Sequence, residues 1–186
     1  MKYALFIHKI ITKVQMKYRK RLFAEKTGQD VSSANFMGKV DVRNKNIKLG
    51  KNVQFRGDVI LDGDGPIVIG DGVRLNHGTI ILASKGGGVT IGARTGIAAY
   101  SYIIDMDHGT QLGDDYRSQP DVVDAIVIGE NVWIGQNVTI LKGSKIGNNA
   151  VCAAKTIITG KEVPENAIVA GVPGKIIKFK GKEEKN

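Results

Sequence analysis

The middle of the chain carries apolar residues at a fixed spacing of six, and this repeat limits the possible folds more than any other feature. The spacing is unbroken over six positions, which are Ile128, Ile134, Ile140, Ile146, Cys152 and Ile158. Three earlier blocks hold nine more positions at the same spacing, which are Leu49, Phe55, Leu61, Ile69, Leu75, Ile81, Ile91, Ile97 and Ile103. A period of six matches neither an α-helix nor a plain alternating strand.

Such a period predicts an all-β solenoid, in which each six-residue unit makes one short strand and one turn. Three units close one triangular coil, so the 15 positions counted above predict about five coils. A small residue often follows the apolar one, and glycine or asparagine tolerates the positive φ of a tight corner. Ile103 and Ile128 are 25 residues apart, which predicts a long loop that leaves the solenoid over residues 109–125.

Charge divides the chain into three parts. The whole sequence has a net charge of +9, but residues 1–26 hold eight bases and one acid, and residues 171–186 hold five bases and two acids. The middle, 27–170, holds 14 bases and 15 acids. We therefore expect a basic segment at 1–26, a nearly neutral domain at 27–178 and a basic tail at 179–186. A neutral body with no recognition motif argues against nucleic-acid binding.

Composition excludes several other classes of protein. The single cysteine, Cys152, rules out a disulfide framework within the chain, and its place on the repeat predicts a core residue. No apolar run is long enough for a transmembrane helix, and no signal peptide is evident. We therefore expect a cytoplasmic protein, and peripheral contact with the inner face of the membrane stays open as an alternative.

Residues 2–23 predict a basic amphipathic helix. Its apolar positions recur at three- and four-residue steps, and they are Tyr3, Phe6, Ile7, Ile10, Val14, Tyr18 and Leu22. Lysines fall on another face of the same helix. The apolar stripe would cap the end of the solenoid or pack on a neighbouring subunit, or it would lie on an anionic membrane surface.

Three segments give the sequence a family resemblance. They are the stretch Asn131-Val132-Trp133-Ile134-Gly135, then Val163-Pro164-Glu165-Asn166, then Ala170-Gly171-Val172-Pro173-Gly174-Lys175. Over roughly residues 45–178 the chain resembles the hexapeptide-repeat acyltransferases, in particular the maltose and galactoside O-acetyltransferases and their relatives in surface-polysaccharide synthesis. The resemblance implies a left-handed parallel β-helix, a homotrimer with active sites between subunits, and acetyl-CoA as co-substrate with no metal required.

His108 is the candidate catalytic base. It opens the long loop, where a rigid scaffold releases a functional segment, and an imidazole can take the proton of an attacking hydroxyl at neutral pH. The resemblance points to the same residue. Asp105 and Asp107 flank it and would orient the imidazole or bind an acceptor hydroxyl. Asn76 resembles the family position that contacts the acceptor sugar, and the role of His77 is left open.

The resemblance also implies a donor site in the C-terminal half. The residues that match the family's coenzyme A contacts are Ala98, Trp133, Gln136, Ala154, Thr159, Lys161, Lys175 and Lys178. The lysines among them would meet phosphate groups, although lysine lacks the two-pronged geometry of arginine.

The predicted function is acetyl transfer from acetyl-CoA to a hydroxyl of a saccharide, by direct attack without a covalent enzyme intermediate. Two alternatives remain, an N-acetyltransferase for an amino sugar and a non-catalytic solenoid scaffold. A zinc enzyme of the γ-carbonic anhydrase type is disfavoured, because the solenoid holds only His77 and His108 where about three histidine ligands are needed. The sequence does not identify the acceptor, the acetylated position or the length of the acyl chain.

Overall fold

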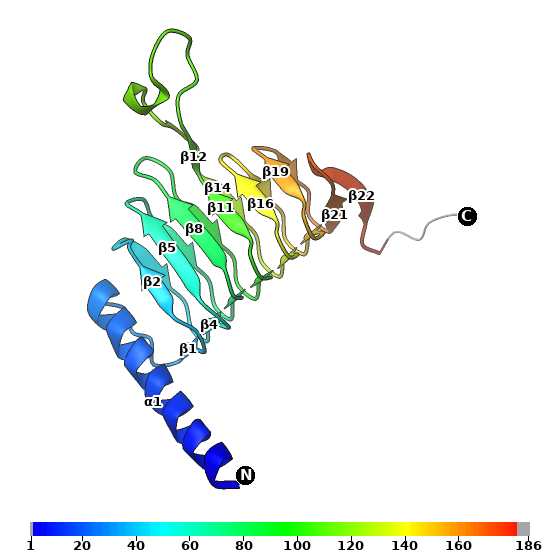
Figure 1. Ribbon diagram of the computed structural model, residues 1–186. Helices are drawn as coiled ribbons and strands as arrows, with labels where there is room; N and C mark the ends of the chain where they lie inside the picture. The colour runs from blue at the N-terminus through cyan, green and yellow to red at the C-terminus, as the bar shows by residue number, and fades with distance from the viewer. Residues whose placement is uncertain (1, 182–186) are drawn as a thin grey trace.

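Each six-residue unit forms one short strand, and successive strands wind into a parallel β-solenoid of about seven turns (Figure 1). The computed structural model describes residues 2–181. Three sheets run along the solenoid, one on each side of the triangular coil. The predicted solenoid class is confirmed, and the predicted number of coils is too low.

Sheet A consists of β1 (Asn35–Phe36), β4 (Gln54–Phe55), β7 (Arg74–Leu75), β10 (Gly96–Ile97), β15 (Trp133–Ile134), β18 (Val151–Cys152), β21 (Ala167–Ala170) and β22 (Lys175–Phe179). Sheet B consists of β2 (Val40–Val42), β5 (Val59–Gly63), β8 (Thr79–Ala83), β11 (Tyr102–Ile104), β16 (Thr139–Leu141) and β19 (Ile157–Thr159). Sheet C consists of β3 (Ile47–Leu49), β6 (Ile67–Ile69), β9 (Val89–Ile91), β14 (Ile126–Ile128), β17 (Lys145–Ile146) and β20 (Glu162–Val163).

The repeated apolar residues stack in register from coil to coil. Leu75 pairs with Ile97, and Ile97 pairs with Ile134, on successive strands of sheet A. All the predicted inward positions are buried except Leu49, which is half-buried. Cys152 lies in this column as predicted, and its burial raises the pKa of the thiol to about 12.

Four further inward positions explain the extra coils. Phe36 and Val42 stack under Phe55 and Leu61, and they begin the solenoid before the predicted first position. At the other end, Val163 stacks on Ile146 and Val169 stacks on Cys152. The steps from Val42 to Leu49 and from Ile158 to Val163 are not six residues, so strict counting misses both ends.

The glycines that follow the inward residues are needed for a reason other than the predicted positive φ. A Cβ at Gly135 would lie 2.6 Å from the backbone nitrogen of Ala154, and one at Gly147 would lie 2.5 Å from the backbone nitrogen of Glu165. The positive φ falls instead on asparagines a little further along the corners, such as Asn137 and Asn149. These glycines therefore allow the next coil to approach closely.

Each end of the solenoid is covered by a different element. At the start, α1 (Lys2–Thr27) places Phe23 against Phe36 and Phe55, with ring centroids 5.2 and 5.7 Å apart. At the other end, β22 pairs antiparallel with β21. Phe179 belongs to β22 and packs against the core, so the predicted tail begins too early; residues 182–186 lie outside the described part. None of the helices described is long and apolar enough to cross a membrane.

Candidate active site

A hairpin leaves the solenoid between sheets B and C and carries His108 (Figure 1). Its base is β12 (Met106–Asp107) paired antiparallel with β13 (Val122–Val123), and the one-turn 3-10 helix η1 (Tyr116–Ser118) lies in the loop between them. Asp107 faces Val122 in this register. The next pair along the hairpin is therefore His108 and Asp121.

The His108 side chain is held by that opposite residue. Its Nδ1 lies 2.9 Å from Oδ1 of Asp121, and its ring centroid lies 5.4 Å from that of Tyr116. A carboxylate only accepts hydrogen bonds, so in the neutral imidazole this contact places the proton on Nδ1 and leaves Nε2 as the acceptor. The His108 side chain is 58% exposed, so Nε2 is accessible to a substrate.

Asp105 has a structural environment. Its carboxylate is fully buried and accepts the backbone N–H groups of Ser84 and Gly88, at 2.8 and 2.6 Å. Its backbone carbonyl accepts the N–H of Asp124, where the hairpin rejoins the solenoid. These bonds fasten the hairpin base to the preceding coil. They occupy the carboxylate that the sequence assigned to an acceptor hydroxyl, and they leave none of it for His108.

Asp107 points to the following coil. Its Oδ2 lies 3.5 Å from Nζ of Lys142, and the Asp107 side chain is about half exposed. It does not pair with His108, so neither of the predicted flanking acids orients the imidazole. Asp121 does so instead.

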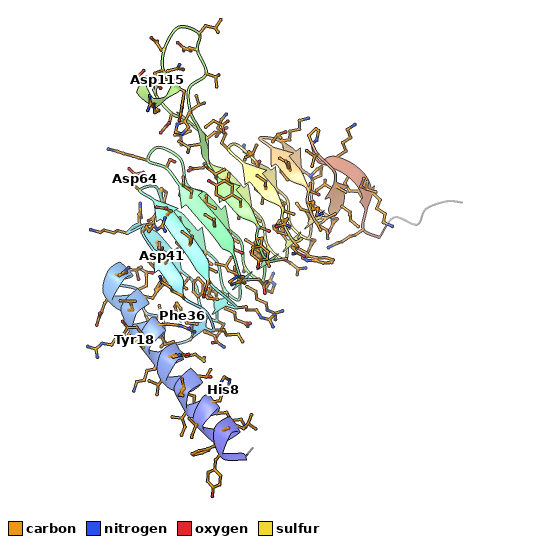
Figure 2. The ribbon with its side chains drawn as sticks, in the orientation of Figure 1. His8, Tyr18, Phe36, Asp41, Asp64 and Asp115 are labelled. Carbon is orange, nitrogen blue, oxygen red and sulfur yellow. The ribbon has the colours of Figure 1, made fainter. Side chains whose placement is uncertain are left out.

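The tip of the hairpin is stabilised by its own side chains. The Arg117 guanidinium pairs with Asp115, which also caps η1 by accepting the backbone N–H of Arg117. These two contacts lower the pKa of the Asp115 carboxyl (Figure 2). The amide of Gln119 reaches across the loop, accepting from the N–H of Gln111 and donating to its carbonyl. The loop that carries Tyr116 is therefore ordered by local contacts rather than by the solenoid.

Asn76 and His77 lie at a different corner, between sheets A and B. The Asn76 side-chain amide donates to the carbonyl of Ile97 on the next coil, at 2.7 Å. His77 accepts the N–H of Asp58 at Nδ1, and its ring meets that of Tyr100 edge to face. Both side chains therefore help to join successive coils, and Asn76 keeps its amide oxygen for other partners.

The predicted donor residues divide between the same two corners. Ala98, Gln136 and Ala154 lie between sheets A and B, close to Trp133, which projects outward from β15 and is 61% exposed. Thr159 ends β19 in sheet B, and Lys161 follows it in the corner between sheets B and C, the corner that carries His108. This corner also holds Lys142, a cation that no sequence pattern singles out. Lys175 and Lys178 lie on β22, beyond the last coil.

One protomer does not bring the two corners together. About six residues of strand and turn separate Ala99 from Asp105 along the coil, which is about 20 Å of extended backbone. Asn76 and His108 therefore stand at opposite ends of the strands of sheet B. Among residues 2–181, no group of three or more His, Cys, Asp or Glu side chains could hold a metal ion.

Comparisons with known proteins agree with this architecture. The family model "Bacterial transferase hexapeptide (six repeats)" matches residues 125–160. Over 149 residues the chain is 38% identical to the Escherichia coli protein named "Putative lipopolysaccharide biosynthesis O-acetyl transferase WbbJ", an alignment that covers 75% of this chain and 74% of that protein.

Two solved structures share the fold. One is a mutant of AntD, an N-acyltransferase from Bacillus cereus, in complex with dTDP-4-amino-4,6-dideoxyglucose and coenzyme A; its TM-score is 0.69 at 18% identity, covering 81% of this chain and 82% of that one. The other is the hexapeptide-repeat acetyltransferase VCA0836 from Vibrio cholerae with acetyl-CoA, with a TM-score of 0.57 at 22% identity, covering 89% and 78%.

Proposed function

The chain belongs to the hexapeptide-repeat acyltransferase family and is an acetyltransferase, and from this premise we propose that it transfers acetyl from acetyl-CoA to a hydroxyl of a saccharide, with His108 as the general base. The observation that carries the proposal is the contact between His108 and Asp121. It orients the His108 ring so that Nε2 is directed away from Asp121 on an exposed side chain, where an acceptor can reach it.

In this mechanism the acceptor hydroxyl attacks the donor carbonyl while Nε2 of His108 takes its proton. The donor supplies the acetyl group as a thioester. Asp121 keeps the imidazole in the required tautomer and stabilises the positive charge that His108 gains, as a carboxylate does in a catalytic triad. The same imidazolium then returns the proton to the departing sulfur. General-base catalysis of this kind contributes about 10²–10⁴-fold.

We propose that the active site is completed by a second subunit, as the family resemblance implies for a trimer. Two observations support this. The corner with Asn76 and the corner with His108 stand at opposite ends of sheet B, so only different subunits could bring them face to face. The outer surface of sheet B is also apolar, with half-buried side chains at Ile60, Ile80, Leu82, Tyr102, Ile104, Leu141 and Ile157.

The residues present suit a coenzyme A donor. The side chains of Ala98 and Ala154 are small, so they leave space at the corner between sheets A and B. An extended pantetheine arm would lie in this space, beside Trp133. Lys161 and Lys175 are exposed cations that would meet phosphate groups. Gln136, Thr159 and Lys178 complete the proposed set.

We propose the chemical class of the acceptor, a saccharide hydroxyl, rather than an individual sugar. The relative from Escherichia coli is named for lipopolysaccharide biosynthesis and O-acetyl transfer, which supports a saccharide hydroxyl. AntD, with an amino sugar in its structure, favours N-acylation as the second candidate. Product chemistry separates the two, because mild base cleaves an acetyl ester and leaves an acetamide intact.

The proposal is tested by incubating the protein with acetyl-CoA and a panel of neutral and amino saccharides, and by identifying acetylated products by mass spectrometry. We expect a base-labile acetyl ester on a neutral sugar, and at least about 100-fold slower turnover for His108→Ala. His8→Ala, which changes a histidine on α1, is the matched control and should turn over like the wild type. Normal turnover by His108→Ala would show that another group is the base.

A further inference from the structure

Only the last part of α1 packs against the solenoid. Phe23 is buried, Met16 is half-buried, and the cationic heads of Arg19 and Lys20 donate to the backbone carbonyls of Met37 and Ser32. Figure 1 shows the helix crossing the first coil beside β2, with its N-terminal part extending past β1. The cap predicted from the sequence is therefore made, but by Phe23 rather than by the predicted apolar stripe.

The predicted stripe itself is uncovered. The large apolar side chains of the helix from Tyr3 to Tyr18 are between 46% and 85% exposed, and they are Tyr3, Leu5, Phe6, Ile7, Ile10, Ile11, Val14 and Tyr18. All of them except Leu5 fall within one arc of the helix, at about 100° per residue. A row of large exposed apolar side chains on one side of a helix is typical of an interaction site.

The arc faces away from the protein. On the same helical projection, Phe23, Met16 and Arg19, which contact the first coil, lie on the side opposite to Ile7, Val14 and Tyr18. No rotation of the helix could bury both sides on the solenoid at once. The apolar arc therefore has to find its partner outside this protomer's own body.

Charge indicates the nature of that partner. Residues 1–26 hold eight bases and one acid, and Glu25 is the first acid of the chain. On this projection Lys13 and Lys17 lie within about 20° of one edge of the apolar arc, and Lys9 lies about 60° beyond that edge. A second copy of the helix would bring a net charge of +7 against +7, and the solenoid body at 27–170 has a net charge of only −1. An anionic lipid surface offers both an apolar layer and negative charge.

We propose that residues 3–18 of α1 dock the protein on an anionic membrane surface. The apolar arc enters the interface between headgroups and acyl chains, the lysines at its edge meet the lipid phosphates, and the helix lies on the membrane rather than crossing it. Phe23 and the capped coil fix the solenoid to this helix, so its first coil faces the membrane. The proposal is independent of the acetyl-transfer activity.

This orientation sets the height of the candidate active site. β11, which leads into the hairpin, lies three coils above β2 in sheet B. At about 4.8 Å per coil and about 10 Å for the helix, His108 would stand about 25 Å from the docking surface. An acceptor attached to a membrane by a linker of that reach would meet it.

The test is flotation of the full-length protein with phosphatidylcholine vesicles, with and without phosphatidylglycerol. We expect binding to the anionic vesicles only, weakened by salt. Replacing Lys9, Lys13 and Lys17 by glutamine should weaken binding about 100-fold, from roughly a fivefold contribution per lysine. The same change at Lys48, Lys145 and Lys155 on the solenoid surface is the charge-matched control and should have little effect.

A pair of neighbouring residues tests the face of the helix. Ile7 lies in the apolar arc and Leu5 lies outside it, yet their side chains are 55% and 59% exposed. Ile7→Asp should reduce vesicle binding at least about tenfold and Leu5→Asp should not, with unchanged helix content by circular dichroism for both. Equal effects of the two would overturn the assigned face.

Light scattering distinguishes the remaining explanation. If the arc instead packs against another copy of the chain, the wild type will fail to bind vesicles and Ile7→Asp will change the oligomeric mass, which would overturn the proposal. Vesicle binding by the wild type together with an unchanged mass for Ile7→Asp would support it. Turnover enters neither measurement, so an inactive preparation does not affect the outcome.

Discussion

The solenoid body and the His108 hairpin are built in opposite ways. In the body, buried residues such as Ile97 and Ile103 are stacked by partners on the coils above and below, so every position is fixed by long-range contacts. In the hairpin, His108 is exposed and is held by Asp121 across a short antiparallel pair. The body is therefore fixed by contacts that its neighbouring coils share, whereas the exposed hairpin can change without disturbing the fold.

The largest effect on stability is expected in the body. Ile103→Ala removes a fully buried side chain from the middle of the column and should lower the free energy of unfolding by about 2–5 kcal/mol, since the neighbouring coils cannot close the cavity. Urea denaturation measures the change. Ile177→Ala, where the side chain is 62% exposed, is the matched control. Equal losses for the two would contradict the stacked column.

The junction between the two regions should give an intermediate effect. Asp105→Asn replaces one carboxylate oxygen by an N–H₂ donor facing the backbone N–H groups of Ser84 and Gly88. We expect a loss of about 1–3 kcal/mol in unfolding free energy, together with weaker hydrogen-exchange protection at 84–88 and at the hairpin base. Asp107→Asn, which loses only an exposed ion pair with Lys142, should change stability by less than about 1 kcal/mol.

The smallest effect is expected at the tip of the hairpin. The bonds from Arg117 lower the pKa of Asp115 in the folded protein, so this carboxyl stabilises the tip above its ordinary pKa and the contribution is lost as pH falls through the lowered value. Arg117→Gln should raise the Asp115 pKa toward its ordinary value, as measured by carboxyl NMR titration. An unchanged pKa would mean that the ion pair does not form in solution.

The body was predictable because its information is periodic. Spacing alone located 15 of the inward positions, and it failed at Phe36, Val42, Val163 and Val169, where steps of seven and five residues interrupt the count. The inward positions at both ends of the solenoid are identified only by their pairing with strands of the neighbouring coils.

The candidate site was less predictable, because its contacts depend on turns that have no repeat. His108 could be selected from the start of the loop, but its partner Asp121 is 13 residues away and becomes adjacent only through the hairpin register. Asp105 lies two residues after the inward Ile103, so its phase on the strand indicated burial, and the acceptor role assigned to it overlooked that phase. Similarly, the exposure of the apolar arc of α1 could not be predicted, because it depends on which side of the helix Phe23 packs against the first coil.

The most direct test of the central claim is a double-mutant cycle on turnover with His108→Ala, Asp121→Asn and the combined variant. If Asp121 acts only by orienting the imidazole, Asp121→Asn should slow turnover and the combined variant should be no slower than His108→Ala alone, because the two residues act as one unit. If the combined variant instead shows the product of the two single losses in turnover, the two residues act independently, which would contradict the proposed pairing. Normal turnover by either single variant would contradict it as well.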